Sequence, residues 1–108
     1  MQKDDAKHIV TELKDILDRS FPGLIRKVLV FGSRAAGNAR EDSDLDVLVV
    51  VRGNMDWRLR NEIIGACYEI DLKYDVVSDI KVLSEDDMNS IRGRQPFVQE
   101  ALEKGVAA

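Results

Sequence analysis

The sequence is poor in the residues that build disulfide frameworks and nucleophilic active sites. It holds one cysteine, Cys67, and one histidine, His8, among 108 residues. A single cysteine excludes a disulfide within the chain. Cys67 falls in a helical pattern and His8 in a polar first turn. We therefore expect Cys67 to fill the core, and we expect no Ser/His/Asp or Cys/His catalytic pair.

Long apolar stretches and an excess of basic residues are also missing. No apolar run approaches the roughly 20 residues that span a membrane, and the opening MQKDDAKH is unlike a signal peptide. We therefore expect a cytoplasmic protein without a membrane partner. The formal net charge of −4 argues against an extended nucleic-acid surface, which is usually basic. The length suits a single domain over residues 1–108, and the 44% of hydrophobic residues is enough for one core.

Short apolar strands alternate with amphipathic helices along the chain. The spacing of apolar residues and of capping residues predicts helices over residues 4–19, 33–38, 56–70 and 95–104, a short helix from residue 84, and strands over 26–31, 44–51 and 73–77. This alternation predicts an α/β (α+β) layer fold. The second strand is apolar almost throughout, so we expect helices on both faces of the sheet.

The stretch from Phe31 to Val51, FGSRAAGNAREDSDLDVLVVV, resembles two known loops without matching either. Its glycines have the P-loop spacing, but Asn38 and Ala39 stand where a P-loop needs Lys and Ser/Thr. The run DSDLD imitates the start of an EF-hand loop, but it lacks the Gly at the sixth position and the Glu at the twelfth. The dinucleotide fingerprint GxGxxG is absent as well.

Two aspartates of this stretch run into a strand. A polar turn explains Asp42 and Ser43, but Asp46 lies within the expected strand. Side chains alternate across a strand, so Asp44 and Asp46 point to the same face. Two neighbouring carboxylates repel each other unless a cation lies between them. Same-face carboxylates are also the ligands that Mg²⁺ uses when phosphates and water complete its octahedron.

The residues before the aspartates can supply a phosphate site. Gly32 directly follows a strand and allows the backbone to approach a ligand closely. Ser33 then opens a helix, whose free N–H groups and positive dipole end favour an anion. Together with the Asp-x-Asp strand, this arrangement predicts a nucleoside triphosphate bound through Mg²⁺.

These residues resemble a known family. Gly32-Ser33, ten further residues and Asp44-Leu45-Asp46 match the GS-x10-D-x-D signature of the DNA polymerase beta-like nucleotidyltransferases. The short length and GSRAAGNAREDSDLD are similar to the minimal nucleotidyltransferase (MNT) branch of prokaryotes. YDVVS resembles the family's third acidic strand, and QPFVQEALEKGV resembles its closing helix. One departure is Ala36, where many MNT chains carry a second arginine, so a phosphate or partner contact from that position is in question.

The resemblance implies the polymerase beta-like fold, a small mixed β-sheet covered by helices, and a third carboxylate. Asp71, Asp75 and Asp79 are the candidates. We select Asp75, because it alone falls in the middle of an expected strand, between Tyr74 and Val76. The alternative interpretation of Asp75 is a solvent-facing residue on an edge strand.

The resemblance also implies the reaction and its site. An acceptor hydroxyl would attack the α-phosphate of an NTP, with ATP as the expected substrate, and pyrophosphate would leave. Two Mg²⁺ ions (or Mn²⁺) about 3.5–4 Å apart would stabilise the attacking and leaving oxygens. The implied catalytic and metal-binding residues are Asp44, Asp46 and Asp75. The implied nucleotide-binding residues are Gly32 and Ser33 for the β- and γ-phosphates, with Arg34 as a further phosphate contact.

The family implies a partner, while other functions stay open. Many MNT chains pair with a helical HEPN toxin that has ribonuclease activity, and MNT members can act as antitoxins by adding AMP to it. We therefore expect a HEPN partner as the acceptor. A contact antitoxin without catalysis is one alternative, and Trp57 could anchor such an interface. A transferase for a small molecule, as in kanamycin nucleotidyltransferase, is another and would need a dimer-built pocket; the sequence leaves open whether the chain forms a homo-oligomer.

Overall fold

The computed structural model describes residues 3–32 and 45–108. The expected helix over 33–38 and the candidate residues Ser33, Arg34 and Asp44 lie outside the described residues. The described elements are α1 (Lys3–Ser20), β1 (Ile25–Phe31), β2 (Leu45–Val51), α2 (Trp57–Tyr74), β3 (Ser78–Ser84), α3 (Glu85–Met88), the 3₁₀ helix η1 (Ile91–Arg94), α4 (Pro96–Lys104) and β4 (Val106–Ala107). In these two stretches of the chain, no helix combines the length and the apolar character needed to cross a membrane.

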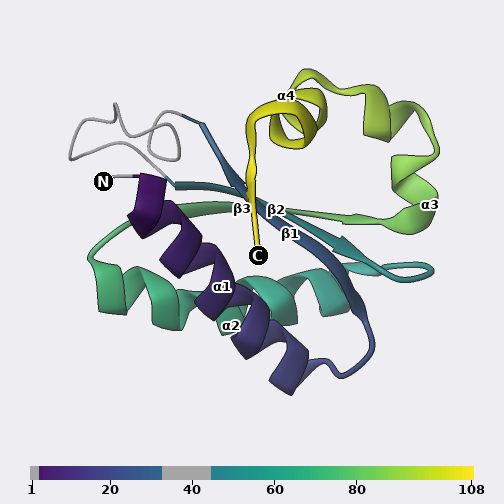
Figure 1. Cartoon of the computed structure of the whole chain (residues 1–108). Helices are drawn as coiled ribbons and strands as arrows, with labels where there is room; N and C mark the ends of the chain where they lie inside the picture. Colours follow the sequence, from purple (N-terminus) through teal and green to yellow (C-terminus); the bar gives the residue numbers. More distant parts are fainter. Residues whose placement is uncertain (1–2, 33–44) are drawn as a thin grey trace.

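The strands form one mixed sheet in the order β3-β2-β1-β4 (Figure 1). β1 pairs antiparallel with both β2 and β4, whereas β2 and β3 run parallel and are connected through α2. β2 therefore lies inside the sheet, which agrees with its continuous apolar run. The predicted small mixed sheet covered by helices is confirmed.

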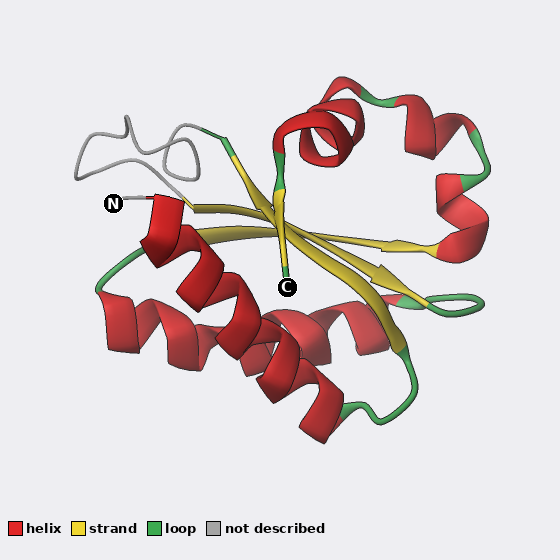
Figure 2. Ribbon diagram, in the orientation of Figure 1, coloured by secondary structure: helices red, strands yellow, loops and turns green. Residues whose placement is uncertain are grey.

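Helices cover both faces of the sheet, as expected from the apolar second strand. α1 and α2 lie together against one face, while α3, η1 and α4 lie over the other (Figures 1 and 2). Val47 and Val49 of β2 belong to the cluster with α1 and α2. Leu48 and Val50 belong to the cluster with Val98 of α4. Alternate residues of one strand thus contribute to two hydrophobic cores.

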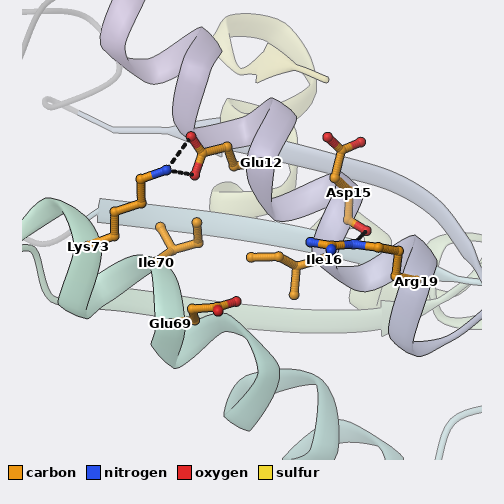
Figure 3. A pocket seen from close by; sticks show the side chains of 7 residues that line it. All are labelled: Glu12, Asp15, Ile16, Arg19, Glu69, Ile70 and Lys73. Carbon is orange, nitrogen blue, oxygen red and sulfur yellow. Dashed lines mark hydrogen bonds and ion pairs between the residues drawn. The ribbon is translucent and has the colours of Figure 1, made fainter.

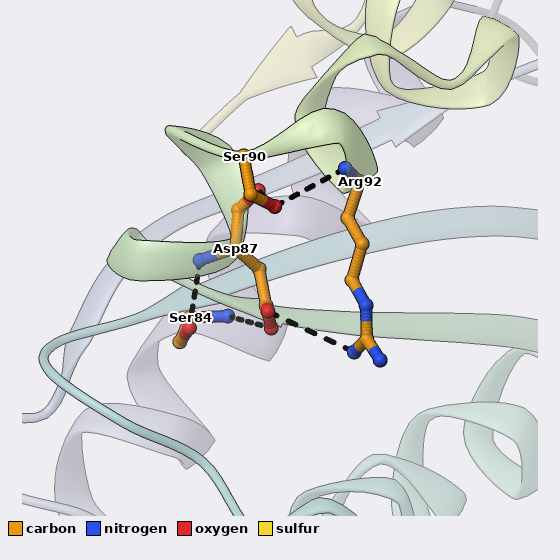
Figure 4. Close-up of polar contacts among 4 residues, drawn as sticks. All are labelled: Ser84, Asp87, Ser90 and Arg92. Carbon is orange, nitrogen blue, oxygen red and sulfur yellow. Dashed lines mark hydrogen bonds and ion pairs between the residues drawn. The ribbon is translucent and has the colours of Figure 1, made fainter.

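Capping residues set the helix boundaries that the sequence predicted. The carboxylate of Asp56 accepts the N–H of Leu59 at 2.8 Å and begins α2. Ser84 and Asp87 form the predicted capping box at α3, each side chain accepting the other's backbone N–H (Figure 4). Pro96 opens α4, and Gly105 is its C-cap. η1 and the two-residue strand β4 were not predicted from the sequence.

The expected strand over residues 73–77 is wrong. α2 continues to Tyr74, and β3 begins only at Ser78. Asp75, which we expected in mid-strand, is instead the exposed C-cap of α2 with a φ of 52°.

The last two residues of α2 contact α1. Lys73 donates to both carboxylate oxygens of Glu12 at 2.9 and 3.0 Å, and the hydroxyl of Tyr74 donates to the same group at 2.8 Å. These hydrogen bonds from Lys73 and Tyr74 lower the pKa of Glu12 below its usual 4.5. They hold the last turn of α2 against a helix some 60 residues earlier in the chain, which local sequence patterns do not report.

The left-handed conformation of Asp75 gives a test of this boundary. An L-residue with positive φ is strained at a position where glycine is not. Asp75→Gly should therefore raise the free energy of unfolding by about 0.5–1 kcal/mol, since it also removes a negative charge from a helix C-terminus. Thermal and urea denaturation would measure it. Asp75→Val, which places a β-branched residue at positive φ, is the matched control and should destabilise. A less stable Asp75→Gly variant would contradict the assignment.

Candidate functional site

Asp46 and Asp79 lie side by side on neighbouring strands. They are direct partners in the parallel register of β2 and β3, and each is the second residue of its strand. Neighbouring strands lie roughly 4.8 Å apart, and paired residues point to the same face. Both side chains are partly exposed. Two carboxylates therefore meet where β2 and β3 begin.

The strand alternation fixes the face on which this pair lies. Asp46 shares its face with Leu48 and Val50, and these two pack with α4. The carboxylates consequently lie on the α4 side of the sheet, at the end of the cluster that contains Leu48. The helices α1 and α2 cover the opposite face.

The backbone of Gly32 approaches this pair closely. Gly32 follows the last residue of β1, Phe31, which is the antiparallel partner of Asp46. Its φ is +88°, and a Cβ at this position would collide with the Asp46 carboxylate. Any other residue here would be strained and would also push Asp46 aside. Glycine thus brings the main chain next to the Asp46 carboxylate.

Lys81 supplies a positive charge beside the two carboxylates. Its ammonium lies 3.0 and 3.2 Å from the two oxygens of Asp79 and 5.7 Å from the ring centre of Phe97. The side chains of Lys81 and Asp79 are 40% and 46% exposed, so the pair is exchangeable and contributes little to stability. A cation held at this point reduces the repulsion between Asp79 and Asp46.

Asp79 was one of three candidates, but the expected strand over residues 73–77 left it outside any predicted element. The sequence does contain a strand pattern here, because SDIKVLS alternates polar Asp79 and Lys81 with apolar Ile80 and Val82. That period of two is typical of a half-buried strand. We did not assign a strand to residues 78–84, because we had assigned the third strand to residues 73–77.

The described carboxylates fit a divalent ion that takes its remaining ligands from a substrate. Within residues 3–32 and 45–108, no group of three His, Cys, Asp or Glu side chains could hold a metal. The pair Asp46–Asp79 nevertheless suits Mg²⁺, which needs only one or two carboxylates when phosphates and water complete its shell. Asp44, the other expected ligand, lies outside the described residues.

Two further candidates, Cys67 and Asp71, lie on α2, which covers the face of the sheet opposite the carboxylate pair (Figure 1). Cys67 is buried in the core, and burial together with the nearby Asp71 carboxylate raises the pKa of its thiol to about 12. Its thiol is therefore protonated and unreactive at neutral pH, which confirms the interpretation of Cys67 as core. Asp71 lies in the last turns of α2, and its Oδ1 is buried without a hydrogen-bond partner among the described residues.

A charged cavity of about 310 Å³ lies between α1 and α2, on the face opposite the carboxylates (Figure 3). Its lining residues are Glu12, Asp15, Ile16, Arg19, Glu69, Ile70 and Lys73. The ion pair between Glu12 and Lys73 spans one side of it. This cavity therefore holds mutually compensating charges and is remote from the carboxylate pair.

Comparison with known proteins identifies the family. Residues 10–107 match the family model described as the nucleotidyltransferase domain. Two proteins of Methanocaldococcus jannaschii, provisionally named protein adenylyltransferases MJ0604 and MJ0141, are 34% and 39% identical to the chain. The first match covers 89% of this chain and 90% of the relative, and the second covers 69% and 68%.

Solved structures share the fold. A provisionally named nucleotidyltransferase from Sulfolobus solfataricus superposes with a TM-score of 0.62 at 23% identity, over 97% of this chain and 80% of that one. The toxin–antitoxin complex MntA–HpeT gives 0.59 at 18% identity, over 90% and 69%. A tri-AMPylated HEPN toxin of Shewanella oneidensis in complex with MNT antitoxin gives 0.54 at 17% identity, over 94% and 70%. The family match over nearly the whole sequence is decisive: the chain belongs to the nucleotidyltransferase domain family.

Proposed function

We propose that this nucleotidyltransferase moves AMP from ATP to a hydroxyl group of a partner protein. The observation that carries the proposal is the pairing of Asp46 with Asp79 beside the backbone of Gly32. Carboxylates that hold Mg²⁺ next to a glycine turn are suited to a bound triphosphate. The names of the two Methanocaldococcus relatives support a protein acceptor.

In this proposal, Asp79 takes the place that the sequence analysis gave to Asp75. Asp44, Asp46 and Asp79 would hold Mg²⁺ (or Mn²⁺), while Gly32, Ser33 and Arg34 would bind the phosphates. Asp79 is favoured because it is the strand partner of Asp46, whereas Asp75 is an exposed helix cap. The bound metal supplies charge stabilisation for the phosphate oxygens on which negative charge develops.

The protein's own groups mainly orient the reactants. The acceptor oxygen attacks the α-phosphorus of ATP, and the bond from that phosphorus to the bridging oxygen of the β-phosphate breaks, so that pyrophosphate leaves. The proton of the acceptor hydroxyl passes to the carboxylate of Asp79 or to water. The N–H groups that follow Gly32 would fix the departing phosphates. Positioning and charge provide most of the rate enhancement, because no covalent intermediate with the protein is needed.

We further propose a HEPN-type toxin as the acceptor, with the reaction taking place in the cytoplasm. The fold is shared with the antitoxin of a complex whose toxin carries AMP. α2 also presents an exposed apolar stripe, formed by Trp57, Tyr68 and Leu72, which are 70%, 60% and 67% exposed and follow helical spacing. Exposed aromatic residues are typical anchors of protein interfaces.

A substitution pair distinguishes the two candidates for the third carboxylate. Asp79→Asn should lower AMP transfer on the order of 100-fold or more, because it removes a charge at the reacting phosphate. Asp75→Asn should keep wild-type turnover, since it changes only an exposed cap. Transfer would be followed with ATP labelled at the α-phosphate, and metal-dependent ATP binding by calorimetry. Normal turnover of Asp79→Asn with loss in Asp75→Asn would return the role to Asp75.

Catalysis and partner binding should be separable. A variant carrying Asp46→Asn and Asp79→Asn should still copurify with the toxin, because the stripe on α2 is unchanged. It should fail to leave the toxin inactive once the two chains are parted. Wild type with ATP should add AMP to a toxin hydroxyl, seen by intact mass. Trp57→Ala should instead weaken copurification.

The competing function is neutralisation by contact alone. In that case the double variant would protect cells as well as wild type, and the separated toxin would be unmodified and active. This outcome would show that the aspartates are dispensable for protection and would rule out the proposed transfer reaction.

A further inference from the structure

A cavity of about 400 Å³ is lined by Lys81, Val82 and Leu83 of the edge strand β3, two to four residues after Asp79 along the strand. Its lining includes Met55 and Arg60 from around the start of α2, Lys81 and Val82 of β3, Arg92 of η1, and Phe97 of α4. Elements from both layers of the fold thus meet at one sheet edge.

The cavity is basic in an acidic protein. Arg60, Lys81 and Arg92 line it, and no Asp or Glu is among its lining residues in the described part of the chain. The whole chain, by contrast, carries a net charge of −4. Lys81 and Arg92 also pair with Asp79 and Asp87, which do not line the cavity, and the exposed parts of the three cations favour an anionic ligand at this place.

Hydrogen bonds position Arg92 at the rim. Ser90 accepts the backbone N–H of Arg92 at 3.2 Å and donates to the carbonyl of Asp87 at 2.7 Å (Figure 4). The guanidinium lies 3.7 Å from the Asp87 carboxylate, which also closes the capping box with Ser84. The side chain of Arg92 is still 63% exposed and available to a ligand.

The order of groups across the sheet places the cavity on the acceptor side. Gly32 follows β1, Asp46 lies on β2 and Asp79 lies on β3, and the cavity is lined by β3 residues that follow Asp79 along the strand. The carboxylate pair therefore separates the proposed phosphate site from the cavity. Lys81 joins the two regions, because it contacts Asp79 and also lines the cavity. Asp79 and Lys81 are two residues apart on β3 and are therefore separated by roughly 6.6 Å along the strand, a distance that one long side chain can cover.

The edge of β3 can also bind main chain. In the described sheet, β2 is the one strand paired with β3. The N–H of Leu45 donates to the carbonyl of Val77 at 2.8 Å. Successive residues of a strand alternate the direction of their backbone groups, so those of Val82, a lining residue of the cavity, point away from β2. An extended segment lying there can pair with this edge as an added strand.

We propose that this cavity docks an extended, acidic segment of the acceptor protein and delivers the neighbouring hydroxyl to the carboxylate pair. The inference rests on the proposed transfer of AMP to a protein. Arg60 and Arg92 would bind acidic side chains of the segment, and Phe97 and Met55 would contact its apolar atoms. The acidic character of the chain as a whole favours a protein segment over a nucleic acid.

The test uses the full chain, Mg²⁺, a non-hydrolysable α,β-methylene analogue of ATP, and a fluorescent random copolymer of glutamate and tyrosine as the acceptor probe. The variant Arg60→Ala with Arg92→Ala should weaken binding of the copolymer roughly 5- to 30-fold, as expected for two partly exposed ion pairs. Arg58→Ala with Arg94→Ala is the matched control, since both residues are exposed and lie on the same two elements outside the cavity lining. This control should change the affinity for the copolymer less than 2-fold. Arg60→Lys with Arg92→Lys keeps both positive charges and should retain most of the wild-type affinity.

Each result decides between the two proposals. If the wild-type chain does not bind the ATP analogue with Mg²⁺, the proposed function itself is overturned. Three results obtained with normal binding of the analogue would overturn the docking site alone. They are no binding of the copolymer, an equal loss of copolymer affinity in both alanine pairs, and tighter binding of a lysine–tyrosine copolymer. Displacement of the copolymer by a single-stranded RNA oligonucleotide at lower concentration would assign the cavity to nucleic acid and likewise overturn it. A melting temperature within a few degrees of wild type checks that each variant is folded.

Discussion

The parallel register between β2 and β3 brings Asp46 beside Asp79, and the proposed chemistry depends on this pairing. A shift of one residue would turn Asp79 and Lys81 to the face covered by α1 and α2. The apolar residues Ile80 and Val82 oppose such a shift, because both are buried on that face. Core packing on one side of β3 thus fixes the carboxylate on the other.

α2 determines where β3 can begin. A parallel strand pair needs a crossover connection, and α2 provides it between β2 and β3. Asp56 begins this helix, and the contacts of Lys73 and Tyr74 with Glu12 extend its far end. The left-handed residue Asp75 then reverses the chain toward β3. The last turn of α2 therefore lies against α1 just before the chain enters β3.

Charge is distributed to suit a reaction between anions. In the proposed site, the carboxylate pair would provide ligands for a cation and the backbone after Gly32 would provide donors, while Lys81 pairs with Asp79. Beyond Lys81, Arg60 and Arg92 make a basic cavity on a chain that is acidic as a whole. ATP and an acidic acceptor segment would then approach the carboxylates from opposite sides of the sheet, which limits repulsion between them.

The sequence by itself determined α1, β1, β2, the start of α2, the capping box at Ser84 and the helix opened by Pro96, because caps and apolar periodicity act over a few residues. It also predicted that Gly32 and Asp46 belong to one site, since both belong to one contiguous motif, and the structure places them side by side. Only the tertiary structure decided that α2 extends through Tyr74 and that Asp79, not Asp75, is the neighbour of Asp46. The physical reason is that strand register and the contact with Glu12 join residues distant in the sequence, and no local pattern encodes either.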